Sequence, residues 1–187
     1  MENNKEKYIK QIRILFCIHC LACACVIAAW IPVLTNLIAW VNIIISIGIS
    51  IVLAQLAENN KRYAKAAIFR GIVVVLSILS KFSNNSIFSL ITSVLLLCSL
   101  YHEYNAHSEM LVNINEKLSK RWKELFSIYL VGSIVMAILS SAFVIALSPL
   151  FLQYATVIVG MVVVLAGGFD LVMMIVYLLY LKQTMRL

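Results

Sequence analysis

The stretch LIAWVNIIISIGISIVLAQLA, residues 37–57, contains no Asp, Glu, Lys or Arg, and the basic stretch ENNKRYAK, residues 58–65, follows it directly. A run of about 20 apolar residues is long enough for a helix to cross the roughly 30 Å hydrocarbon layer of a membrane. Basic residues directly beside such a run favour the cytoplasmic side of the membrane. Residues 37–57 therefore predict a transmembrane helix that ends at the cytoplasmic surface.

Apolar runs alternate with basic clusters over the whole chain. Hydrophobic residues make up 63% of the 187 residues, while charged residues make up only 12%; a soluble domain has about a quarter. The sequence predicts six transmembrane helices, at approximately residues 12–31, 37–57, 66–80, 87–100, 125–147 and 151–181. Six spans leave only short connections, so residues 1–187 are predicted to form a single transmembrane domain.

The positions of the basic residues predict the orientation of these helices. Of the fifteen Lys and Arg residues, fourteen lie on one side of the predicted arrangement, and Lys81 lies alone on the other. The positive-inside rule then places both termini in the cytoplasm. The predicted protein is an all-α, multi-pass integral membrane protein, a six-helix bundle of three helical hairpins. The net charge of +7 comes from basic residues beside the predicted spans, where they favour the anionic surface of the lipid bilayer. We therefore expect the bilayer, and not a nucleic acid, as partner. Frequent Asn, Ile and Lys indicate a bacterial cytoplasmic membrane.

Asp170, in the stretch LAGGFDLVMM, is the sharpest candidate for function. It lies about 16 Å from the predicted cytoplasmic boundary, near the midplane of the bilayer. A carboxylate there is costly unless it is paired, hydrated or protonated, so we expect it to face the bundle interior. It either serves a transported solute, proton or ligand, or forms a structural hydrogen bond to another helix. Gly167 and Gly168 before it allow close helix packing, a kink or the approach of a ligand.

His19 is the second candidate, roughly 10 Å from the same boundary. It comes within reach of Asp170 if helices 12–31 and 151–181 are neighbours. A His–Asp pair would neutralise both groups and relay protons. The alternative is a histidine whose ring is satisfied by a serine or a backbone carbonyl.

Two cysteines near His19 are weak candidates for a metal site. Cys20 and Cys23 form a CxxC pair one helical turn apart, a spacing that suits a soft ion. A neutral cysteine, however, packs well as a small apolar residue. We therefore expect no metal and no cofactor.

Polar residues within the apolar runs have two interpretations. Arg70 lies in the first turns of helix 66–80, and its long side chain is expected to reach back to the interface. Ser46 and Ser50 recur at a spacing that allows neighbouring helices to approach closely. We interpret these serines as packing seams; the alternative is a pore lined by serines and Asn42.

Residues 101–124 are predicted to form a cytoplasmic loop. Its residues His102, Glu103 and His107 are interpreted as a solvated patch at the interface, with a weak metal site or a pH-sensitive contact as alternatives. The spacing is HExxxH, not the HExxH of zinc proteases. The two histidines therefore diverge on a helix.

Within this loop, residues 108–124 are predicted to form an amphipathic segment. Leu111, Leu118 and Trp122 fall on one face at helical spacing. This segment is either an interfacial helix that leads into the next span or a docking surface for a cytoplasmic protein partner.

Two functional hypotheses follow. The first is a transporter, a channel or a transporter subunit for a small solute or ion, with Asp170 at the midplane. The alternative is a non-transporting accessory, immunity or sensor protein that acts through loop 101–124. An enzyme acting on lipid lacks a clear set of catalytic residues, so no catalytic residue is predicted. The sequence leaves open whether the chain forms a homo-oligomer.

Overall fold

The computed structural model describes residues 2–83, 86–146 and 152–186. In these ranges the chain forms six α-helices and one short 3-10 helix, η1 (Pro32–Leu34). The helices are α1 (Glu2–Ala28), α2 (Thr35–Leu56), α3 (Lys61–Phe82), α4 (Ser86–Leu111), α5 (Glu116–Ala146) and α6 (Leu152–Thr184). Each of the six is long and apolar enough to cross a membrane. The prediction of an all-helical protein with six membrane-spanning helices is therefore confirmed at this level.

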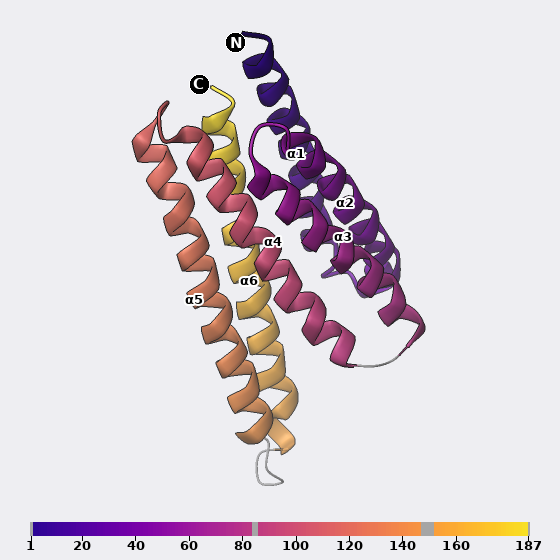
Figure 1. The fold of residues 1–187 in the computed structure, drawn as a ribbon. Coiled ribbons are helices and arrows are strands. Elements are labelled where there is room, and N and C mark those ends of the chain that lie inside the picture. Colours follow the sequence, from indigo (N-terminus) through magenta and orange to yellow (C-terminus); the bar gives the residue numbers. More distant parts are fainter. Residues whose placement is uncertain (1, 84–85, 147–151, 187) are drawn as a thin grey trace.

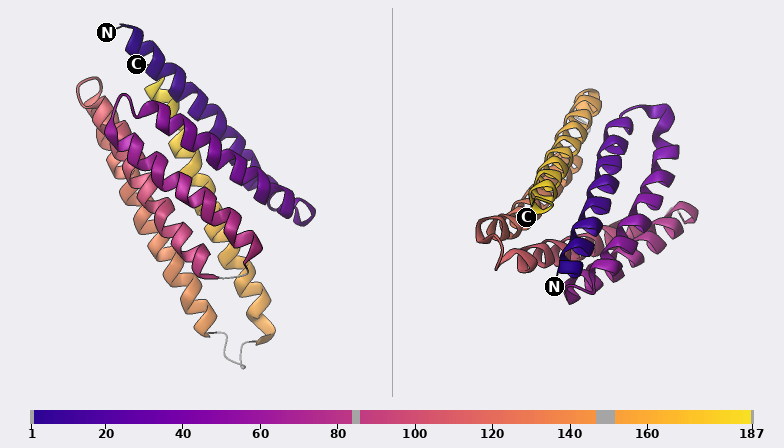
Figure 2. Two further views of the ribbon diagram at one scale, coloured as in Figure 1. Left: turned by 45° about the vertical axis from the view of Figure 1, so that its right-hand side comes forward. Right: turned by 90° about the horizontal axis from the view of Figure 1, so that it is seen from above.

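The helices form a closed ring in the order of the sequence. Consecutive helices run in alternating directions, and the start of α1 and the end of α6 lie at the same end of the bundle (Figure 1). We call this end the terminal end and the opposite one the distal end. Each helix packs against the next along the chain, and α6 packs against α1 (Figure 2). This ring leaves an interior toward which all the helices can direct side chains.

The hydrophobic core lies toward the terminal end. The largest fully buried apolar side chains belong to the terminal halves of the helices: Ile12, Leu15, Leu53, Leu56, Tyr63, Leu111, Leu118, Trp122 and Leu181. Toward the distal end, large apolar side chains such as Phe82 and Leu90 are exposed, as suits helices surrounded by lipid. The bundle is thus tightly packed at its terminal end and looser beyond.

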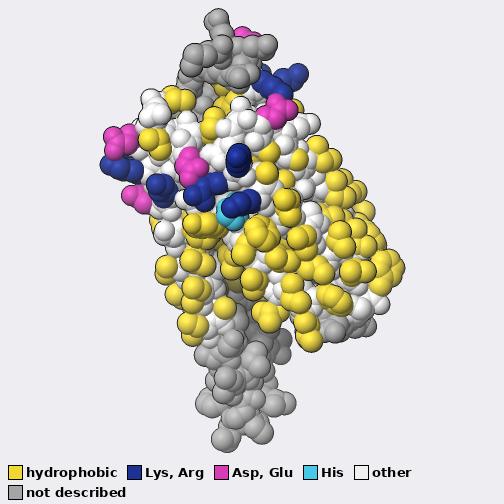
Figure 3. Space-filling model, viewed as in Figure 1, with side chains coloured by type: hydrophobic (Ala, Val, Ile, Leu, Met, Phe, Trp, Pro, Cys, Tyr) yellow, Lys and Arg dark blue, Asp and Glu magenta, His cyan; other side chains and the backbone are white. Residues whose placement is uncertain are grey.

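Charged and apolar surfaces are separated along the bundle. On the face drawn in Figure 3, Lys and Arg side chains gather toward the terminal end, and hydrophobic side chains cover the surface below them. Ion pairs near the terminal end join Lys7 to Glu58, and Arg62 to Glu109 at 2.6 Å. This is the distribution of a protein with an apolar belt beside a polar interface.

The predicted loop 101–124 is largely helical. Helix α4 continues to Leu111 and α5 begins at Glu116, so residues 112–115 alone connect them. Asn115 caps α5, because its side-chain oxygen accepts a hydrogen bond of 3.0 Å from the Leu118 N–H. The amphipathic segment 108–124 is therefore not a separate element. Residues 108–111 belong to α4, residues 116–124 belong to α5, and residues 112–115 connect the two helices.

Candidate functional site

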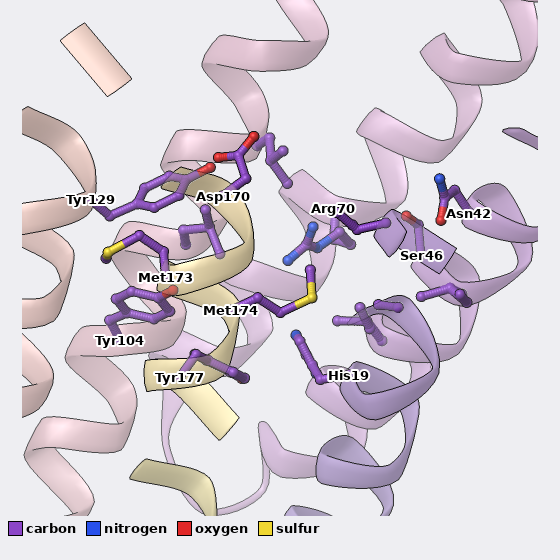
Figure 4. A pocket seen from close by; sticks show the side chains of 16 residues that line it. His19, Asn42, Ser46, Arg70, Tyr104, Tyr129, Asp170, Met173, Met174 and Tyr177 are labelled. Atoms are coloured by element: carbon purple, nitrogen blue, oxygen red, sulfur yellow. The ribbon is translucent and has the colours of Figure 1, made fainter. Parts of the chain in front are cut away.

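A cavity of about 320 Å³ lies inside the ring, and side chains from all of α1–α6 line it (Figure 4). We call it the central cavity. Its polar lining residues are His19, Asn42, Ser46, Arg70, Tyr104, Tyr129, Asp170 and Tyr177. The other lining residues are apolar, and the volume lies at the lower end of the range of ligand pockets, about 300–1,000 Å³.

The helical period explains why these residues meet. Residues three and four apart share one face of a helix, and each helix that supplies several lining residues supplies them at this spacing. On α4 the lining residues are Leu96, Leu100 and Tyr104; on α6 they are Asp170, Met173, Met174 and Tyr177. One face of each helix thus serves the cavity, while other faces meet neighbouring helices or lipid.

A buried pair of opposite charges lies at the cavity wall. Arg70 Nη2 on α3 is 3.5 Å from Glu103 Oε2 on α4, and the two residues are 7% and 0% exposed. The Tyr177 hydroxyl on α6 donates a hydrogen bond to Glu103 Oε1. Two expectations are therefore wrong: Arg70 does not reach back to the interface, and Glu103 is not solvated. If either side chain moved into water, the other would remain buried as an unpaired charge, which is costly.

Aromatic side chains close the ring between the cavity and the terminal end. We call Tyr8, Tyr63, His107, Trp122 and Tyr177 the aromatic layer. The Tyr63 hydroxyl lies 2.7 Å from His107 Nδ1 and 3.5 Å from the Tyr8 hydroxyl. The His107 ring stacks on Trp122, with 4.5 Å between ring centroids. These contacts tie α1, α3, α4 and α5 together.

The predicted interface residues belong to this packed end. Leu111, Leu118 and Trp122 are at most 2% exposed, so their side chains offer no surface to a partner. The predicted patch of His102, Glu103 and His107 does not exist either. Glu103 and His107 are fully buried, whereas His102 stacks on Phe69 with 5.7 Å between ring centroids. Glu103 and His107 are four residues apart on one face of α4, which is directed toward the interior of the ring, whereas the adjacent His102 lies on a different face.

Asp170 lies at the junction of two cavities. It lines the central cavity and also a cavity of about 480 Å³ between α4, α5 and α6, which we call the lateral cavity. Its carboxylate lies beside Tyr129 (Figure 4). Within the described residues, Asp170 takes part in no ion pair. The carboxylate is exposed to the cavity space rather than sealed in the protein.

His19 lines the same cavity but does not pair with Asp170. Helices α1 and α6 are neighbours, as that prediction required. His19 Nδ1 instead lies 2.9 Å from the Leu15 carbonyl oxygen, to which it donates, and the ring packs on Tyr177 at 4.5 Å between centroids. Among the described residues no ion pair joins His19 to Asp170. The arrangement matches the backbone-carbonyl alternative.

The other sequence candidates lie outside the cavity lining. A Cβ on Gly167 would come within 3.1 Å of the Trp30 ring, so this glycine permits close packing. Gly168 faces open space, and α6 continues through both glycines. Cys20 is exposed and Cys23 is half-buried, and both thiols are free. In the described ranges no group of three metal-ligating side chains is placed to hold an ion.

A third cavity extends the polar lining toward the distal end. This distal cavity, of about 330 Å³, lies between α2, α3 and α4 and shares Asn42 and Ser46 with the central cavity. It continues past Ser77 and Thr92 to Lys81. Ser46 thus lines cavities, whereas the Ser50 hydroxyl donates to the Ala67 carbonyl at 3.0 Å and forms the predicted seam between α2 and α3.

Sequence analysis missed the Arg70–Glu103 pair; the available signal was a basic residue inside one apolar run and an acidic residue three positions after the end of the next run. The fold and this site define the class of the protein as a six-helix ring with a polar cavity inside it. Comparisons of the chain with protein-family models, with curated proteins and with solved structures give no match.

Proposed function

We propose that this protein moves a small solute or ion across the cytoplasmic membrane through the central cavity, either alone or as the subunit of a transporter. The observation that carries the proposal is a cavity lined by α1–α6 with the carboxylate of Asp170 on its wall. Ionisable residues within a membrane usually mark solute or ion pathways. Transporter sites also lie near the midplane, at the interfaces of helices.

Access to the cavity supports the same proposal. The polar distal cavity leads from Asn42 and Ser46 toward the distal end, while the aromatic layer fills the ring at the terminal end. In alternating access, each conformation of a transporter opens the binding site to one side of the membrane and closes it to the other. The central cavity has this arrangement. In this proposal the aromatic layer is the cytoplasmic barrier.

The proposed orientation, with both termini in the cytoplasm, makes a labelling prediction. In a variant whose five cysteines are replaced, Lys81→Cys at the distal end is expected to react with a membrane-impermeant maleimide in intact cells. Lys120→Cys at the terminal end is expected to react only after permeabilisation, because basic residues favour the cytoplasmic side. Both lysines are exposed, so they form a matched pair. The reverse labelling pattern would exclude this orientation.

The transport proposal predicts a specific loss with Asp170→Asn. In liposomes that contain the purified protein, uptake of the solute is expected to fall about tenfold or more, since losing a charged contact costs about 1.5–3 kcal/mol. Glu109→Gln is the matched control: it removes a carboxylate at the terminal end, paired with Arg62, and should leave uptake unchanged. Equal uptake by the Asp170→Asn variant and the native protein would remove the basis of the proposal.

One observation favours the non-transporting alternative. Val112 and Ile114, in the connection between α4 and α5, are apolar and exposed beside charged residues. They offer a small surface for a partner where Leu118 and Trp122 do not. If changing both to Ser abolishes the cellular phenotype while Asp170→Asn leaves it intact, the accessory or sensor function is the better account.

A further inference from the structure

We propose that the central cavity binds a small organic cation, an amine or a quaternary ammonium ion, with Asp170 as its counter-ion. This inference rests on the proposed function in one respect, because it takes the central cavity as the place where the solute binds. Binding can nevertheless be measured without transport.

The charges around the cavity indicate the sign of the ligand. Arg70 is matched by Glu103 at 3.5 Å, and that pair is almost completely buried. His19 uses Nδ1 to donate to the Leu15 carbonyl. Of the charged side chains that line the cavity, Asp170 is the one without an ion-pair partner in the described part of the chain. A carboxylate at this depth favours a cation that arrives as its partner.

The rest of the lining indicates the body of the ligand. Most of the remaining wall is aliphatic or sulfur-containing: Ala22, Val26, Ile45, Ile49, Leu96, Leu100, Met173 and Met174. The rings of Tyr104, Tyr129 and Tyr177 add aromatic faces, and Tyr129 lies next to the Asp170 carboxylate (Figure 4). Aromatic faces attract ammonium ions through cation–π contacts. The wall therefore suits a positive group attached to a small apolar body.

The same wall is poorly suited to other solutes. A bare metal cation needs several oxygen ligands around one point, but Asn42 and Ser46 lie across the cavity from Asp170 (Figure 4). An anion would have to compete with Glu103 for Arg70, whose side chain is only 9% exposed. A neutral solute would leave the Asp170 carboxylate without a partner.

The lateral cavity supports an apolar cation for a separate reason. It shares Leu96, Tyr129 and Asp170 with the central cavity, so the carboxylate is reachable from both. Its described lining is largely apolar and contains no basic residue, so it offers a second approach to Asp170 besides the distal cavity, in which a cation passes Lys81. An amphiphilic ammonium ion can therefore approach Asp170 between α4, α5 and α6 without passing a positive charge.

The test is calorimetric binding of three cations to the purified full-length protein in detergent: choline, tetraethylammonium and phenethylamine. The neutral control is 3,3-dimethylbutan-1-ol, which has the shape of choline without its charge. At least one cation is expected to bind, and choline is expected to bind at least about tenfold more tightly than its neutral counterpart. Asp170→Asn is expected to weaken cation binding roughly 30-fold or more, the lower end of the effect of removing one partner of a desolvated charge pair.

Two further variants keep the result interpretable. Glu109→Gln removes an exposed carboxylate that is paired with Arg62, and should leave the affinity unchanged. Should Asp170→Asn fail to fold, as judged by gel filtration and circular dichroism, Tyr129 provides the second measurement. Tyr129→Leu removes the aromatic face and should weaken binding about threefold or more, and it should weaken binding more than Tyr129→Phe, which keeps the ring.

The outcomes distinguish the cation-binding inference from the transport proposal. Absence of binding by all three cations, equal binding of the neutral alcohol, or unchanged affinity in the Asp170 and Tyr129→Leu variants overturns the inference. Binding of ammonium ions without their uptake into liposomes upholds the inference and contradicts transport by this protein alone. Uptake of another solute, together with no cation binding, does the opposite.

Discussion

Glu103→Ala is expected to destabilise the protein by about 3–5 kcal/mol, because Arg70 then keeps a buried charge without its partner. Glu103 is fully buried, and its two carboxylate oxygens serve Arg70 and the Tyr177 hydroxyl. The same change therefore breaks contacts of α4 with both α3 and α6. The measurement is the free energy of unfolding in mixed detergent micelles, followed by circular dichroism.

A paired replacement separates the charge from the packing. The double variant Arg70→Met and Glu103→Leu removes both charges and keeps similar volumes, so it should lie within about 1–2 kcal/mol of the native protein. Tyr177→Phe removes only the hydroxyl that donates to Glu103, and should cost about 1 kcal/mol. If the double variant is as unstable as Glu103→Ala, the stranded charge is not the cause.

Trp122→Ala is expected to lower the free energy of unfolding by about 3–5 kcal/mol, since it removes the largest fully buried side chain and leaves a cavity in the core. The indole contacts Tyr104, His107, Tyr177 and Tyr180, with centroid distances of 4.5–5.6 Å. No neighbouring ring can fill such a space without leaving its own contacts. The loss should appear as a lower unfolding temperature of the protein in detergent.

Trp40→Ala is the matched control for this substitution. Trp40 is 48% exposed on α2, outside the aromatic layer, and its removal is expected to cost less than about 1 kcal/mol. A comparable loss of stability in both variants would show that the aromatic layer contributes no more to the fold than an exposed ring does.

The six long apolar helices could be predicted because the signal for each of them is local. Each span is a long apolar run bounded by polar residues, and such a run has few alternatives to a helix in lipid. The ends of the helices were less accurate. Helix α3 begins at Lys61, where the Asn60 side chain accepts a 2.8 Å hydrogen bond from the Arg62 N–H, and α4 runs on through His102 to Leu111. The backbone hydrogen bonds of a helix continue into the polar residues beyond the apolar run, and hydropathy gives no signal for these residues.

The site was harder to predict because it depends on which helices are neighbours. Depth along the helix was enough to select Asp170 and His19, and both line the central cavity. Depth was not enough for Glu103, because its polar surroundings in the sequence indicate contact with water, whereas the structure buries it beside Arg70. Whether a polar residue faces water or the interior depends on the rotation of its helix and on the partner opposite. Arg70 and Glu103 illustrate this, because each charged side chain can be buried only while the other is its partner.

The order of the ring has a consequence for biosynthesis. Because helices adjacent in space are adjacent along the chain, every seam except that between α1 and α6 can form as soon as the next helix leaves the ribosome. Helix α3 is made before α4, so the Arg70 guanidinium is without its carboxylate until the following helix arrives, which favours joint insertion of the two. A nascent chain that stops before α6 has a ring open along one side and lacks both Asp170 and Tyr177. In such a chain the Glu103 carboxylate lacks the hydroxyl that donates to it, and Arg70 alone remains as its partner.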